Sequence, residues 1–116
     1  MAITGAHVLL NTPEPEALRA VLRDVFGWNF VDDGHGWLIF ALPPAELGVH
    51  PSDGATTHEL SFMCDDIVAT KAELEAKGIT FKGEPTDQGF GIVVTAVLPG
   101  GVEVLVYEPR HASPLA

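Results

Sequence analysis

The sequence predicts an α+β fold made of two pseudo-symmetric βαβββ modules, whose strands form a curved mixed sheet around a cavity with the helices outside. The first reason is an internal repeat, because Gly27 and Gly78 lie at the same 20-residue distance after His7 and His58. The second reason is that an apolar stretch, a helix-like segment and several strand-like segments follow in the same order in each copy. One copy alone would leave a sheet face uncovered, so we expect the two to pack together.

The length of 116 residues fits one domain and is too short for two independent ones. We therefore expect a single domain over residues 1–116. Its first module covers residues 3–51, its second covers residues 57–109, and a tail follows over residues 110–116.

Each module is expected to begin with a strand that leads into a helix. The strands are predicted at residues 8–10 and 60–63, where apolar residues follow the histidine. A threonine before a proline in one copy, and two aspartates in the other, are typical of helix starts. The helices are predicted over residues 13–26 and 66–77, and each ends at a glycine that suits a left-handed stop.

Three strand-like segments bounded by Gly, Pro and Asp residues follow the helix in each copy. They cover residues 28–31, 36–42 and 46–50 in the first copy, and residues 79–82, 91–98 and 102–108 in the second. Glu46 and Glu103 correspond in the repeat, because each lies two residues after the start of a turn.

The composition limits the classes of partner. A formal net charge of −10 makes nucleic acid an unsuitable partner, because phosphate binding needs clustered Lys and Arg. The charge can serve solubility or attract a cationic ligand. The single cysteine, Cys64, has apolar neighbours and is expected to fill space in a strand. The start of the chain does not resemble a signal peptide, and no apolar run is long enough to span a membrane, so we expect a cytoplasmic protein without a membrane partner.

With His7 and His58 at the heads of the two modules and the ending PGG-x-E-x-L-x-Y-E-P over residues 99–109, the chain resembles the vicinal oxygen chelate superfamily. That superfamily includes glyoxalase I, extradiol dioxygenases, fosfomycin-resistance enzymes and bleomycin-resistance proteins. The resemblance covers residues 6–109 and implies a small-molecule ligand or substrate and a homodimer.

The resemblance also implies a divalent metal ion, whether Fe, Mn, Ni, Co or Zn, in the members that use one. Its histidine ligands would be His7 and His58, and we expect Glu103, a carboxylate near the expected position, to be the third ligand and the catalytic acid or base. The positions of the two histidines match the family well. The alternative to metal binding is that both histidines line a cavity.

The carboxylates depart from the pattern of that family. Leu105 and Gly48 stand where the metal-binding carboxylates are expected, while Glu103 and Glu46 lie two residues earlier. A two-residue step moves the Cα by about 6.5 Å along a strand, so a β-bulge would have to restore the position. His50 offers another ligand nearby.

The remaining candidates are residues that can line a small-molecule pocket. Trp37, Tyr107, His50 and Leu105 are expected to contact the ligand, although aromatic side chains also serve as core. Arg110 and His111 follow the last strand and can close the mouth of the pocket, and the alternative is that they belong to a disordered tail.

Two functions remain open on the sequence. One is a metal-dependent lyase, isomerase or dioxygenase that acts on a substrate with vicinal oxygens. The other is a metal-free binding protein that sequesters an aromatic or cationic antibiotic, as bleomycin-resistance proteins do.

Overall fold

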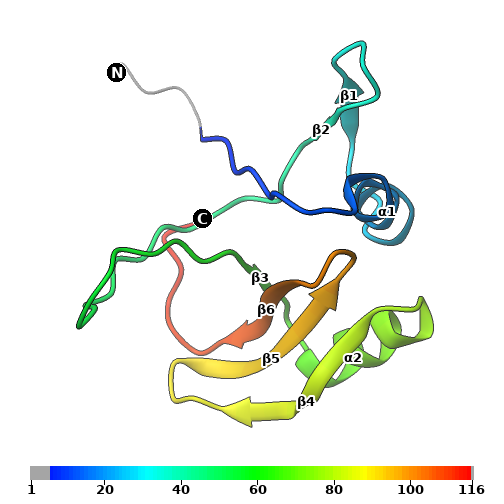
Figure 1. Cartoon of the computed structure of the whole chain (residues 1–116). Coiled ribbons are helices and arrows are strands. Elements are labelled where there is room, and N and C mark those ends of the chain that lie inside the picture. The colour runs from blue at the N-terminus through cyan, green and yellow to red at the C-terminus, as the bar shows by residue number, and fades with distance from the viewer. Residues whose placement is uncertain (1–5, 116) are drawn as a thin grey trace.

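The computed structural model describes residues 6–115 and has a mixed α+β architecture with two helical regions and two β-sheets (Figure 1). The strands of this part of the chain form two separate sheets and not a closed barrel. The predicted α+β class is therefore confirmed. The expected start of the first module at residue 3 and the last residue of the tail lie outside the described residues.

The second half of the chain forms a four-stranded sheet and one helix in the predicted βαβββ order. Strand β3 pairs in parallel with β6, while β6 with β5 and β5 with β4 are antiparallel, so the sheet is mixed and its order is β3-β6-β5-β4. The elements are β3 (Ser61–Met63), α2 (Ile67–Ala76), β4 (Thr80–Asp87), β5 (Gly91–Leu98) and β6 (Val102–Pro109).

Helix α2 forms where local signals place it. The Asp66 carboxylate accepts a hydrogen bond from the backbone N–H of Ala69 at 3.0 Å, which makes Asp66 the N-cap. The Glu108 carboxylate on β6 accepts from the backbone N–H of Ile67 at 3.0 Å. Gly78 ends the helix with a φ of 92°. The helix start is thus satisfied by one local and one distant carboxylate.

The hydrophobic core lies between one face of the four-stranded sheet and the two helical regions. It consists of buried apolar residues, which are Leu18, Ile67, Ile79, Val94, Ala96, Leu98, Val104 and Val106. Because side chains alternate along β6, Glu103, Leu105 and Tyr107 point to the opposite face.

The first half of the chain is less regular than the second. Helix α1 (Pro15–Ala20) continues into a π-helical turn, η1 (Val21–Val25), so the predicted helix is found with shorter ends. Strands β1 (Phe30–Asp32) and β2 (Leu38–Phe40) form an antiparallel hairpin, each shorter than predicted.

Two predicted strands of the first module, residues 8–10 and 46–50, are wrong for the single chain. Both segments are extended but belong to no sheet. Apolar side chains in the second of these stand in solvent, with Leu47 and Val49 being 93% and 95% exposed. The apolar pattern indicates a tendency to form a strand, but a strand forms only where another strand satisfies its backbone.

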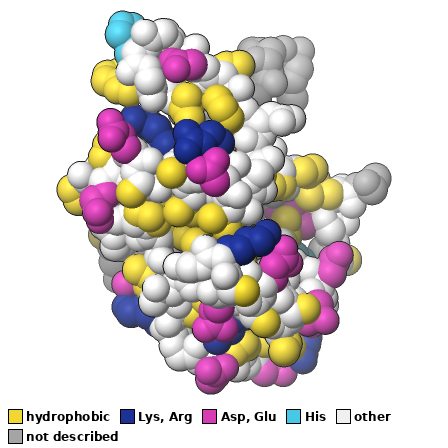
Figure 2. All heavy atoms as spheres, turned by 90° about the vertical axis from the view of Figure 1, so that its right-hand side faces the viewer, with side chains coloured by type: hydrophobic (Ala, Val, Ile, Leu, Met, Phe, Trp, Pro, Cys, Tyr) yellow, Lys and Arg dark blue, Asp and Glu magenta, His cyan; other side chains and the backbone are white. Residues whose placement is uncertain are grey.

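An aromatic cluster joins the two halves. The ring of Phe62 on β3 packs edge-on against Phe26 at 5.7 Å and against Trp28 at 5.3 Å between centroids. Figure 2 shows hydrophobic side chains gathered across the middle of one face, between the part of the chain that holds α1 and the part that holds α2.

The turn between β5 and β6 forms a second contact between the halves. The Thr12 hydroxyl, just before α1, donates a hydrogen bond to the carbonyl oxygen of Pro99 at 3.4 Å. Gly100 has a φ of 84°, and a Cβ atom there would overlap the Thr12 hydroxyl. The close approach therefore requires glycine at this position.

We predict that Gly100→Ala destabilises the protein more than Gly101→Ala does. Gly101 has a φ of 73° but open space around its Cα, so its substitution costs only the left-handed strain of about 1–2 kcal/mol. Gly100→Ala adds a steric clash that costs roughly a further 1–3 kcal/mol. Urea unfolding of both variants measures the difference. Equal decreases in the free energy of unfolding for the two variants would show that Thr12 does not pack against Gly100.

Candidate functional site

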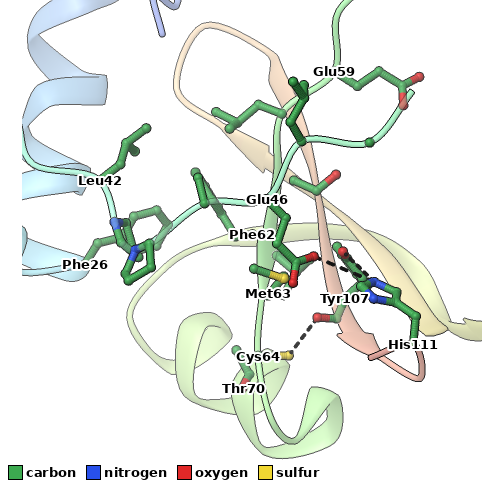
Figure 3. Close-up of a pocket in the computed structure, with 18 of the residues that line it drawn as sticks. Phe26, Leu42, Glu46, Glu59, Phe62, Met63, Cys64, Thr70, Tyr107 and His111 are labelled. Atoms are coloured by element: carbon green, nitrogen blue, oxygen red, sulfur yellow. Dashed lines mark hydrogen bonds and ion pairs between the residues drawn. The ribbon is translucent and has the colours of Figure 1, made fainter. Parts of the chain in front are cut away.

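A large pocket lies along the free edge of β3, between the two halves of the chain (Figure 3). Strand β3 is the end strand of its sheet, with β6 on one side, so its other edge opens on the pocket. The pocket has a volume of about 1200 Å³. Its walls are the end of η1, the extended segment of residues 42–52, β3 with its flanks, and the end of β6 with the tail.

One side of the pocket carries a connected group of polar side chains. Nε2 of His111 lies 3.3 Å from the Tyr107 hydroxyl and 3.9 Å from a carboxylate oxygen of Glu46. The Ser113 hydroxyl donates a hydrogen bond to the same carboxylate. The Glu46 side chain is only 15% exposed, and Figure 3 shows it pointing toward His111 above Met63. The extended segment and the tail therefore meet over β6.

The neighbours of His111 fix the tautomer of its neutral ring. Nδ1 lies 3.0 Å from the carbonyl oxygen of Ala112, which can only accept, so Nδ1 carries the proton. Nε2 then accepts from the Tyr107 hydroxyl. Burial, and secondarily the charge of Glu46, raise the pKa of Tyr107, so its hydroxyl stays protonated and able to donate at neutral pH.

Apolar side chains form part of the remaining wall, which also carries polar side chains such as Ser61, Thr70 and Glu73. Phe90 packs edge-on against Tyr107 at 5.9 Å, and Phe26, Phe62 and Met63 border the pocket near the free edge of β3. An arrangement of apolar walls with a few convergent polar groups is typical of small-molecule sites.

Cys64 also faces the pocket, with its Sγ 3.6 Å from the carbonyl oxygen of Tyr107. Burial raises the pKa of its thiol, so the nucleophilic thiolate is disfavoured. The residue acts as a small filler, in keeping with its apolar surroundings.

The three predicted metal ligands do not form a group within one chain. His7 and His58 are exposed, and Glu103 is held by Lys82 with Nζ and Oε2 2.7 Å apart. Among residues 6–115, no three His, Cys, Asp or Glu side chains are gathered closely enough to hold a metal ion. The residues therefore do not fit the divalent ion that the family often uses, and we derive no chemical step through it.

The predicted ligand-contacting residues divide into two sets. Tyr107 and His50 line the pocket, and the His50 Nδ1 lies 2.8 Å from the carbonyl oxygen of Pro51. Leu105 is half-buried beside Ser61 of β3, on the sheet face that also carries Tyr107. Trp37 is exposed beside β2, and its ring packs near His35.

Sequence reasoning overlooked several pocket residues. It placed Arg110 and His111 at the pocket mouth, and the structure has His111 among the lining residues, but it gave no role to Ser113. The tail lies outside the repeat, so neither residue has a counterpart that would draw attention to it. Phe26 and Met63 are pocket residues whose sequence pattern looks like that of ordinary core positions.

None of the helices in the described part of the chain is long and apolar enough to cross a membrane. No curated protein matches the sequence closely enough to count as a relative.

Several solved structures have the same fold at low sequence identity. TnmS3, an antibiotic-binding protein from a Streptomyces species, superposes with a TM-score of 0.69 at 21% identity and covers 95% of this chain and 99% of its own. Lactoylglutathione lyase from Agrobacterium tumefaciens has a TM-score of 0.64 at 22% identity, with coverages of 93% and 96%. The fosfomycin resistance protein FosX from Listeria monocytogenes has a TM-score of 0.60 at 16% identity, with coverages of 95% and 94%.

These likenesses establish the shared fold and no particular activity, because proteins of one fold differ widely in function. The sequence model of one family matches residues 5–111, which is nearly the whole chain. The chain therefore belongs to the glyoxalase/bleomycin resistance protein/dioxygenase superfamily.

Proposed function

We propose that this protein binds an aromatic small molecule in the pocket beside β3, and that it does so without a metal ion. The observation that carries the proposal is the contrast between two sets of side chains. Aromatic and apolar groups line one large pocket together with several polar side chains, among them the hydroxyl of Tyr107. The expected metal ligands lie apart, and Glu103 is occupied by Lys82.

The similarity in fold to an antibiotic-binding protein is consistent with this function. Sequestration needs only a pocket that favours the ligand over water, and it needs no nucleophile. The disfavoured thiolate of Cys64 suits such a role.

A metal-dependent reaction is the second candidate, and one observation favours it. Residues 8–10 and 46–50 lack strand partners, and His7 directly precedes the first of these segments while Glu46 begins the second. Pairing of these segments with a second copy of the chain would change the surroundings of both residues. A site assembled from two chains would then use His7, His58 and Glu103, with Glu46 as a further ligand.

We further propose that the protein is a homodimer. Leu47 and Val49 are almost fully exposed, and exposed apolar side chains of this kind usually find a partner. The Cα radius of gyration is 15.3 Å, whereas a compact domain of this length has about 13 Å. An open protomer of this kind suits a partner of identical shape.

Binding of quinoline, a neutral bicyclic aromatic compound, tests the main proposal. We expect calorimetry to give the same dissociation constant with excess EDTA and with added Mn²⁺, Co²⁺, Ni²⁺ or Zn²⁺. Tyr107→Leu should weaken binding roughly threefold to tenfold, because the ring borders the pocket. Phe30→Leu, in the hairpin outside the pocket, is the matched control and should bind as the wild type does.

Dependence on metal would overturn the proposal. If quinoline bound only after a metal ion had been restored, and His7→Ala abolished that effect, the second candidate would take its place.

The mass of the protein in solution tests the homodimer. Light scattering after size-exclusion chromatography should give twice the mass of one chain, and Leu47→Asp should shift it to a single chain. Val68→Asp, at an exposed site on α2, introduces the same charge elsewhere and should leave the dimer intact. A single-chain mass for the wild type at all concentrations would contradict the proposal.

A further inference from the structure

We infer that the ligand is a cation, and that its positive charge lies against the carboxylate of Glu46 beside the ring of Tyr107. This inference rests on the proposed function, since it names the class of molecule that the same pocket takes.

The Glu46 carboxylate is largely covered and forms no ion pair with a Lys or Arg side chain of residues 6–115. It accepts a hydrogen bond from Ser113 and is otherwise near His111. Five of the six Lys and Arg residues in the chain are engaged by other carboxylates, and no ion pair among residues 6–115 joins a Lys or Arg to Glu46. These pairs are Arg23–Asp24, Lys71–Glu75, Lys77–Glu73, Lys82–Glu103 and Arg110–Asp87.

The nitrogens of the His111 ring are directed at groups other than Glu46. The single N–H of the neutral ring points to the carbonyl oxygen of Ala112, and its other nitrogen accepts from Tyr107. Neither ring nitrogen therefore donates to Glu46 in this tautomer. A covered carboxylate has lost most of its contacts with water, and Glu46 has one hydroxyl donor in their place. A cation within contact distance would stabilise such a carboxylate further.

The surroundings of Glu46 leave room for that cation. Glu46 lines the large pocket and also a smaller one of about 300 Å³, and Met63 and Cys64 are likewise common to the two. The ring of Tyr107 borders the same space, and an aromatic face attracts a positive charge within about 6 Å of its centre. Figure 3 shows the Glu46 carboxylate between these groups and the open pocket.

The charge of the whole chain acts in the same direction. Sixteen acidic residues against six basic ones produce a field that concentrates cations near the surface. The covered carboxylate of Glu46, beside an aromatic ring, is then the site in the pocket where such a cation would bind.

Quinoline and N-methylquinolinium test the inference, because they differ by one methyl group and one positive charge. At pH 8, where quinoline is uncharged, we expect the wild type to bind N-methylquinolinium about tenfold more tightly. Glu46→Gln should remove this preference and change quinoline binding by less than about twofold. Unchanged quinoline binding also verifies that the variant is folded.

Glu84→Gln is the matched control, because it makes the same change in net charge at an exposed site outside the pocket. It should keep the preference for the cation. A preference that survives in Glu46→Gln, or equal binding of the two compounds by the wild type, would overturn the inference and leave the proposed function standing. If the wild type bound neither compound, both would fail.

Discussion

The free edge of β3 is the constraint on which the rest of the structure depends. A strand has hydrogen-bonding groups on both sides, and β3 uses one side for its parallel pairing with β6. Its other side faces the first half of the chain, where the described residues, from Ala6 onward, supply no strand that pairs with it. The space between them is the pocket. The openness of the protomer and the presence of a binding site thus have the same origin.

Neighbouring residues of β3 have two different roles, which are to hold the two halves of the chain together and to line the pocket. Phe62 shares a sheet face with Val106 and packs against Phe26, which holds the halves together. Met63 pairs with Tyr107 in the register and faces the other way, toward Glu46. Because side chains alternate along a strand, one short element both docks the two halves and lines the pocket.

Sequence reasoning succeeded where local signals decide the structure. Helix α2 has a capping aspartate and a terminal glycine, so it was predicted within one residue at each end. The strands at residues 8–10 and 46–50 were not found, because the apolar pattern indicates the tendency to form a strand but not the presence of a partner. The contacts of Ser113 and the pairing of Glu103 with Lys82 depend on tail position and strand register, which no spacing in the sequence encodes.

Glu46 and Glu103 show that residues at equivalent positions of an internal repeat need not have the same function. The repeat makes them equivalent, and a symmetric metal site would use them in the same way. Their surroundings differ, because Glu103 is 51% exposed and paired with Lys82, while Glu46 is largely covered and has Ser113 and His111 as its polar partners among residues 6–115. A carboxylate already held by an ammonium group offers little to a ligand cation. The two modules have therefore diverged in charge balance while keeping a related sequence pattern, and the first module retains the carboxylate that a ligand can use.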